Sequence, residues 1–204
     1  MNYRIPLRLD DGVWLFADIP SVEARRRVLR RTLAEAIDCT EGDIVIGRTA
    51  NGKPMLKHPT DRLFFNTSHR DDIVLVALAW NRPVGVDLEL LPCAGGDAVA
   101  GTFFSAGEKR WLSSAENGDG AAFARLWTAK EAVLKAAGTG IAQGLAEPDL
   151  AAALTPGRPL GGGDVRLHAA GGDFAIRWFP AATRRRNVMA ARALALPPAP
   201  SCLA

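Results

Sequence analysis

The first forty residues change from an alternating pattern of apolar and polar positions to a helical one. Residues 4–18 alternate around Val13, with a turn sequence at residues 10–12 (DDG), which is typical of one or two strands joined by a turn. Ser21 stands at a position that suits an N-cap, and residues 22–37 carry apolar side chains at helical spacing opposite a face rich in arginine. The pattern predicts a strand hairpin followed by an amphipathic helix.

Strand patterns dominate the rest of the chain, which also contains one strong helical segment. Residues 126–137 are filled mainly with alanine, leucine, lysine and glutamate, and Gly138 stands where a left-handed C-terminal cap would fall. The other apolar runs are short and bounded by turn-forming residues. We expect further strands at residues 44–46, 63–69 (passing into a polar bend), 73–80, 84–89, 164–168, 173–179 and 187–196.

Each half of the chain combines a helix with several antiparallel strands, which predicts an α+β fold. The glycine pair at residues 95–96 is a plausible link between two halves. We therefore expect an N-terminal half at residues 1–97, a C-terminal half at residues 98–196 and a flexible tail at residues 197–204, where prolines prevent a strand.

Composition and charge limit the cellular compartments and the classes of binding partner that are compatible with the sequence. The 204 residues are 48% apolar, enough for a packed core, and the formal charge is +3. The three cysteines are widely spaced, which argues against a disulfide framework or a zinc site. Without an apolar signal core or a membrane-spanning run, we expect a cytoplasmic protein with no membrane or nucleic-acid partner. Arginine clusters at residues 25–27, 30–31 and 184–186 indicate either an anionic partner or solvated faces.

One stripe of the predicted helix carries three chemically distinct side chains. Trp127, Glu131 and Lys135 are four residues apart and therefore project from the same face. Glu131 and Lys135 can be explained as a surface ion pair, which would contribute only about 0.3–0.5 kcal/mol.

An acidic strand upstream favours a second interpretation of this stripe. Asp87 and Glu89 are two residues apart in an apolar run, so on a strand they point the same way, with their backbones roughly 6.5–7 Å apart. Together with Glu131 they make three carboxylates near the junction of the halves, where pockets tend to form. Oxygen ligands of this kind suit a hard cation such as Mg²⁺, and Lys135 could hold a phosphate.

Three weaker candidates each have a structural explanation as well. Lys53 is held out from a rigid turn and is either a phosphate contact or an exposed turn lysine. Ser68 and His69 are either hydrogen-bond donors for a phosphate or a turn serine beside a surface histidine. A nucleophile and base pair is rejected because neighbours on an extended chain point to opposite faces. Glu108 lies three residues after Ser105, the spacing of a capping box, which competes with a catalytic role.

Four segments together resemble one known family, the Sfp-type 4′-phosphopantetheinyl transferases. Its two signatures are a Gly-hydrophobic-Asp-x-Glu strand and a Trp-x-x-Lys-Glu-Ala-x-x-Lys helix followed by a Gly-x-Gly-like turn. These occur at residues 85–89 (GVDLE) and 127–135 (WTAKEAVLK), with Gly138 and Gly140 after the helix. Two weaker family segments stand before them in the same order, at residues 52–54 (GKP) and 65–69 (FNTSH).

The resemblance implies a monomer of two similar α/β halves related by a pseudo-twofold axis, with coenzyme A and Mg²⁺ bound between them. Asp87, Glu89 and Glu131 match the metal-binding carboxylates, and Glu131 is also the candidate general base. The residues that it implies for coenzyme A are Lys53, Ser68, His69, Asp87 and Lys135, and the catalytic set is Asp87, Glu131 and Lys135.

Two positions are less completely defined by the resemblance. Glu108 aligns with an acidic residue that has a supporting role in the family. The N-terminal segment is shorter than is usual, so Arg25, Arg26 or Arg30 would have to replace its basic contacts to the 3′-phosphate and adenine.

The implied reaction moves the 4′-phosphopantetheine group of coenzyme A to a serine of an acyl or peptidyl carrier protein and releases 3′,5′-ADP. A basic surface would steer carrier proteins, which are acidic around that serine. The form of the helix motif favours a role in secondary metabolism. Two alternatives remain, a non-catalytic module that binds carrier proteins and a Mg²⁺-dependent phosphodiester hydrolase.

Overall fold

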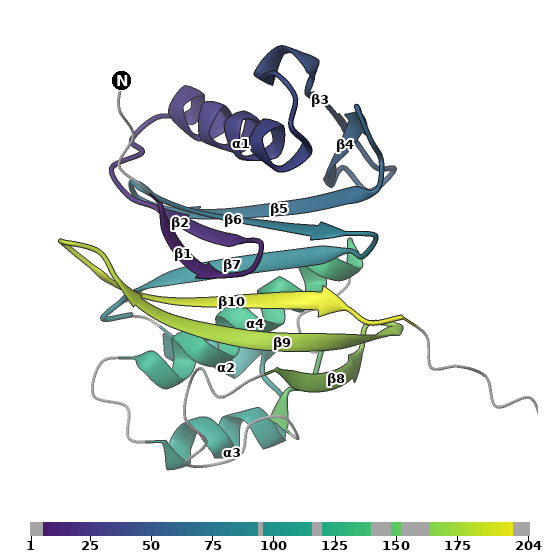
Figure 1. Ribbon diagram of the computed structural model, residues 1–204. Helices are drawn as coiled ribbons and strands as arrows, with labels where there is room; N and C mark the ends of the chain where they lie inside the picture. Colours follow the sequence, from purple (N-terminus) through teal and green to yellow (C-terminus); the bar gives the residue numbers. More distant parts are fainter. Residues whose placement is uncertain (1–5, 94–95, 116–119, 140–147, 152–163, 198–204) are drawn as a thin grey trace, which may run out of the picture.

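Two four-stranded antiparallel sheets form the centre of the computed structural model (Figure 1), which describes residues 6–93, 96–115, 120–139, 148–151 and 164–197. The first sheet has the order β1-β2-β6-β5, and the second has the order β7-β10-β9-β8. The strands of the first are β1 (Leu7–Asp10), β2 (Val13–Phe16), β6 (Ile73–Trp80) and β5 (Leu63–Arg70). Those of the second are β7 (Val84–Leu91), β10 (Asn187–Ala195), β9 (Gly172–Ala182) and β8 (Val165–Ala169).

One long helix covers the outer face of the first sheet. This helix, α1 (Val22–Ile37), begins as predicted at Ser21, whose side chain accepts a hydrogen bond from the Ala24 N–H at 3.1 Å. Its buried residues Val28 and Leu33 pack with Val76 of β6. The 3₁₀ turn η1 (Glu41–Asp43) and the hairpin of β3 (Val45–Arg48) and β4 (Pro54–His58) follow it.

A second long helix covers the outer face of the second sheet. This helix, α4 (Ala121–Ala137), ends at Gly138, which adopts the predicted left-handed conformation with φ 77°. Leu126 and Val133 of α4 pack in one core with Met189 of β10. Two shorter helices, α2 (Gly96–Phe103) and α3 (Ala106–Ser114), precede it.

The inner faces of the two sheets pack against each other, so the layers run helix, sheet, sheet, helix (Figure 1). Leu75 of the first sheet and Val86 of the second belong to this shared apolar core. The fold is therefore α+β with mainly antiparallel sheets, as predicted. The pseudo-twofold relation of the halves stays a prediction.

Several details differ from the expectations or lie beyond the described residues. Helix α2 was not predicted, because its glycine-rich start at Gly96 was interpreted as a link; this glycine packs against the Phe123 ring, where a Cβ would lie 2.6 Å from ring carbons. Strand β7 hydrogen-bonds to β10, so the sheet groups it with the later residues, although the division at residue 97 stays a prediction. Gly140 and most of the predicted tail lie outside the described residues.

Within the described part of the chain, no helix has both the length and the hydropathy needed to cross a membrane.

Candidate active site

A pocket of about 370 Å³ lies where the edges of the two sheets meet helix α4. One wall is the end of β5, residues 67–70, and Asp87 of β7 lies across from it. Trp127, Glu131 and Lys135 of α4 complete the lining, as their spacing of four residues predicted. The pocket thus brings together most of the side chains that the sequence singled out.

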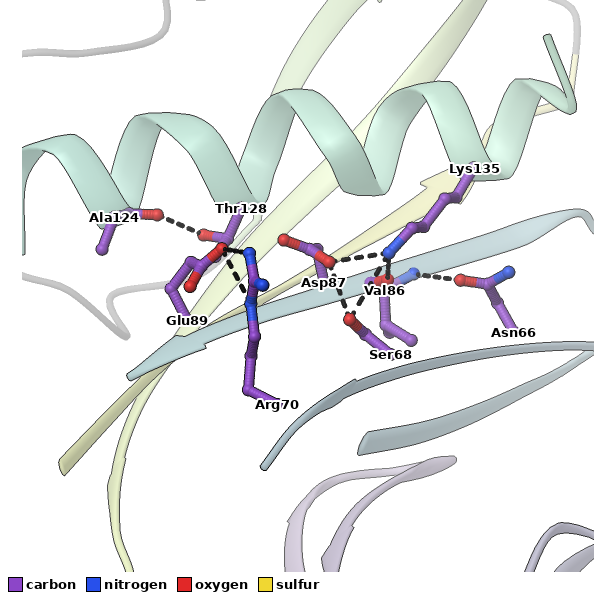
Figure 2. A network of polar contacts seen from close by, with 9 residues as sticks. All are labelled: Asn66, Ser68, Arg70, Val86, Asp87, Glu89, Ala124, Thr128 and Lys135. Carbon is purple, nitrogen blue, oxygen red and sulfur yellow. Dashed lines mark hydrogen bonds and ion pairs between the residues drawn. The ribbon is translucent and has the colours of Figure 1, made fainter. Parts of the chain in front are cut away.

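Strand β5 contacts β7 through every second side chain (Figure 2). The Asn66 side-chain oxygen accepts a hydrogen bond from the Val86 N–H at 3.0 Å. Two residues later the Ser68 hydroxyl donates to Asp87, and two further on the Arg70 guanidinium donates to Glu89. Because alternate residues of a strand share a face, these three β5 side chains all reach the neighbouring sheet.

Asp87 is the centre of the polar network in Figure 2. Its Oδ1 accepts hydrogen bonds from the Ser68 hydroxyl at 2.7 Å and from the Lys135 amino group at 2.6 Å. Lys135 also donates to the Val86 carbonyl at 3.2 Å, so its ammonium is held between α4 and β7. The Asp87 side chain is 8% exposed, whereas Lys135 remains 28% exposed and can meet a ligand in the pocket.

Glu131 is the carboxylate of the site that has an unsatisfied buried oxygen. Its Oε1 is buried and has no hydrogen-bond partner among the residues that the structure describes. Burial raises the pKa of Glu131, and the nearby charge of Asp87 raises it further, although Lys135 acts in the opposite direction. A buried acceptor with a raised pKa is suited to bind a cation or to take up a proton.

Asp87, Glu89 and Glu131 do not form a preorganised metal-binding site. Among the described residues, no three histidine, cysteine, aspartate or glutamate side chains lie close enough together to bind one metal ion. The cations of Lys135 and Arg70 neutralise Asp87 and Glu89 instead. The unpartnered oxygen of Glu131 remains available to a cation, so the donor set fits Mg²⁺ in its chemistry.

His69 lies in a positive environment at the edge of the same pocket. Burial lowers the pKa of His69, and the charges of Arg25, Lys135 and Arg70 lower it further. Of the N-terminal arginines considered above, Arg25 is the one whose charge contributes to this lowering of the His69 pKa. Such a collection of positive charge favours an anionic ligand.

Two protein-family models match consecutive parts of the chain. Residues 16–81 match the description "4′-phosphopantetheinyl transferase, N-terminal", and residues 83–183 match "4′-phosphopantetheinyl transferase superfamily". The chain belongs to the 4′-phosphopantetheinyl transferase superfamily. This membership confirms the resemblance inferred from the four sequence segments.

Individual relatives in the family cover part of the chain. The 4′-phosphopantetheinyl transferase HetI of Nostoc sp. is 36% identical over 140 residues, 67% of this chain and 58% of HetI. The transferase gsp of Aneurinibacillus migulanus is 33% identical over 115 residues, 56% of this chain and 46% of gsp. The transferase psf-1 of Bacillus pumilus is 35% identical over 130 residues, 61% of this chain and 54% of psf-1. The chain thus spans about half the length of these curated relatives.

The family resemblance assigns a phosphate contact to Lys53, but the structure places this residue apart from the pocket. Its amino group donates to the carbonyls of Lys135 and Ala136 at the C-terminus of α4, and to that of Val84. Lys53 thereby caps orphan carbonyls at the negative end of the helix dipole. It also lines a second, more apolar pocket of about 240 Å³ beside Gly138, and its contact with a phosphate stays a prediction.

Lys53 should make the stability of the protein depend on pH. Burial lowers its pKa from 10.5 to about 8, although the carbonyl contacts favour the charged form. Between these values the unfolded chain binds more protons than the folded one, so stability rises with pH as the burial cost of the charge disappears. Urea denaturation at pH 7 and pH 9.5 should show wild type gaining stability relative to Lys53→Met. An unchanged difference between the two proteins would contradict the lowered pKa.

Glu108 has a structural role that leaves no free oxygen for the site. It forms the predicted capping box with Ser105, and both of its oxygens accept hydrogen bonds from the Lys130 amino group at 2.8 and 2.9 Å. The Leu150 N–H adds a further hydrogen bond at 2.8 Å. Glu108 is fully buried and does not line the pocket of Asp87 and Glu131, so the geometry favours the capping explanation.

Sequence reasoning did not single out Arg70 or Lys130. Arg70 follows Ser68 by two residues, and this spacing is the signal that places both on one face of β5. Lys130 gave no such signal, because a lysine next to Glu131 on a helix is usually solvated.

Proposed function

We propose that this protein transfers the 4′-phosphopantetheine group of coenzyme A to a serine of a carrier protein and releases 3′,5′-ADP. Family membership supports the reaction class, and the relatives HetI, gsp and psf-1 are named as 4′-phosphopantetheinyl transferases. The observation that carries the proposal is the pocket in which Asp87, Glu131 and Lys135 meet from two separate elements. Two acids and a lysine in this arrangement are suited to phosphoryl chemistry on a charged substrate.

Lys135 and Glu131 would have different roles in the reaction. Lys135 is partly exposed and would contact the pyrophosphate, where it stabilises charge on the bridging oxygen as the bond to phosphorus breaks. Glu131 would accept the proton of the attacking serine, because its Oε1 has no hydrogen-bond partner in the described part of the chain and its pKa is raised. The serine oxygen forms the new bond to phosphorus, and 3′,5′-ADP departs with the electron pair of the broken bond.

The remaining polar groups hold these two residues and the substrate in place. Ser68 of β5 and Lys135 of α4 both contact Asp87, and these contacts join β7 to β5 and to α4. His69 and Arg25 would face the negative charge of the nucleotide end. The family resemblance assigns Mg²⁺ to Asp87, Glu89 and Glu131, and the metal would supply positive charge to the pyrophosphate when bound. For Asp87 and Glu89 to bind it, the metal would have to replace their contacts with Lys135 and Arg70.

The proposal predicts that Asp87→Ala and Glu131→Ala each abolish transfer while the fold is retained. Each protein is incubated with coenzyme A, Mg²⁺ and a panel of apo carrier proteins from fatty acid, polyketide and non-ribosomal peptide synthesis. Intact mass spectrometry of each carrier should show the added phosphopantetheine with wild type and no addition with either variant. Circular dichroism checks that the variants are folded.

Each alternative outcome has a definite meaning. Transfer by either variant at the wild-type rate would refute the assignment of its residue. Binding of a carrier by wild type without a mass gain would indicate a non-catalytic binding module. Release of 3′,5′-ADP from coenzyme A without any carrier would indicate a hydrolase that uses water.

A further inference from the structure

The hairpin between β9 and β10 extends beyond the strands beside it (Figure 1). Its turn contains three exposed arginines, residues 184–186. Its turn, residues 183–186, is held by backbone and hydroxyl contacts. The Thr183 N–H donates to the Arg186 carbonyl at 2.8 Å, and the Arg186 N–H donates to the Thr183 hydroxyl at 3.0 Å. The turn does not need the arginine side chains for its shape.

The charge at this tip is only partly compensated. Arg186 lies 3.9 Å from Asp71, and both side chains are more than half exposed. Within the described part of the chain, Arg184 and Arg185 have no ion-pair partner. Two exposed cations side by side, without an ion-pair partner among the described residues, give the tip a local positive potential that favours an anionic group outside this chain.

The tip adjoins the candidate active site. Asp71 directly follows Arg70, which lines the pocket of Asp87, and Asp71 and the tip arginines together line a hollow of about 390 Å³. Asn187, the first residue of β10, is paired with Leu91, two residues beyond Glu89. A molecule large enough to cover the pocket mouth would therefore reach the hairpin as well.

The acidic residues of the hollow restrict which partner fits. Asp18, Asp71 and Asp72 line the same hollow as the three arginines. A continuous polyanion such as nucleic acid or an anionic membrane would be repelled by these acids. A protein surface with a local acidic cluster can contact Arg184 and Arg185 while keeping its own basic residues near the aspartates.

We propose that Arg184 and Arg185 dock the acidic surface of the carrier protein beside the serine that is modified. This inference rests on the proposed transfer, because it assigns that reaction's protein substrate to a surface of the chain. The hairpin would set the approach of the carrier, while the pocket performs the chemistry.

The double variant Arg184→Glu/Arg185→Glu tests this docking surface. The KM for the apo carrier protein should rise at least about tenfold at low salt, with kcat at saturating carrier and the KM for coenzyme A unchanged. At about 0.5 M NaCl the difference from wild type should shrink, because screening weakens contacts between exposed charges. Fluorescence anisotropy of a labelled apo carrier should show the same loss of affinity.

A matched control separates the hairpin from net charge. Arg82→Glu/Arg166→Glu makes the same charge change at two exposed arginines, one in the turn at the other end of β7 and one on β8, and should leave the carrier KM as in wild type. Equal KM changes in both double variants would overturn the docking surface, as would wild-type affinity in the hairpin variant.

Failure of the transfer itself gives a different result. If wild type binds the carrier but adds no mass, the proposed function fails, and the anisotropy comparison still tests the hairpin. If wild type binds no carrier, both proposals are wrong. Tighter binding of a short DNA duplex than of any carrier, lost in the hairpin variant, would overturn the choice of partner.

Discussion

Replacing Lys130 by methionine will lower the free energy of unfolding by about 3–5 kcal/mol, because it leaves the buried charge of Glu108 without its cation. Both side chains are 0% exposed. Lys130 also donates to the Pro148 carbonyl at 2.6 Å, so the pair joins α3, α4 and the segment at residues 148–151. Urea denaturation of Lys130→Met and wild type measures the loss.

Two further variants show whether the loss comes from the buried charge. Lys57→Met removes an exposed lysine and should change stability by no more than about 0.5 kcal/mol. Lys130→Met/Glu108→Leu should recover only part of the loss, because Glu108 also accepts hydrogen bonds from the N–H groups of Ser105 and Leu150. A cost for Lys130→Met as small as that for Lys57→Met would contradict the burial of the pair.

Gly85→Ala will reduce transfer by more than its loss of stability explains. Strand β7 approaches α4 so closely at Gly85 that an added Cβ would lie 2.0 Å from the Ala132 carbonyl oxygen and 2.4 Å from the Ala136 nitrogen. These are backbone atoms, so the helix itself would have to move. Overpacking of this kind typically costs about 1–3 kcal/mol. The shift would also carry Glu131 and Lys135 away from Asp87.

The matched control for Gly85→Ala is Gly101→Ala. Gly101 lies on α2, and an added Cβ there meets no atom within 4 Å. Because alanine favours helices over glycine, this variant should be neutral or more stable by up to about 1 kcal/mol, with wild-type activity. Gly85→Ala with wild-type stability and wild-type transfer would show that the close contact of β7 and α4 does not set the site.

The parts of the fold that depend on local sequence were predictable. The cap at Ser21, the capping box at Ser105 and the left-handed end at Gly138 each follow from side-chain chemistry within a few residues. The bounds of α1 agree with the prediction for the same reason. The pairing of β7 with β10 could not be predicted, because it joins segments almost a hundred residues apart.

The candidate site likewise has features that local sequence predicts and features that depend on tertiary structure. The stripe of Trp127, Glu131 and Lys135 follows from helical spacing, and all three side chains line the pocket. The pairing of Arg70 with Glu89 depends on how β5 lies beside β7, which local patterns do not specify. The hydrogen bond from the Lys53 amino group to a carbonyl of α4 could not be predicted either, because the turn that carries Lys53 and that helix meet only in the folded chain.

The reason for the glycine in the GVDLE segment also comes from tertiary structure. Its φ is not in the left-handed region, so no turn requires it; the backbone of α4 fills the space that a side chain would occupy. The glycine of the motif is thus required for the close contact between strand and helix, and the acidic residues that follow it contribute to the site.

A crystal structure with coenzyme A and Mg²⁺ bound is the most direct test of the site. We predict that the pyrophosphate lies in the pocket of Ser68, Asp87, Glu131 and Lys135, with the Lys135 amino group on a phosphate oxygen and the metal in contact with Glu131. Coenzyme A bound elsewhere on the molecule, with this pocket holding only water, would contradict the account.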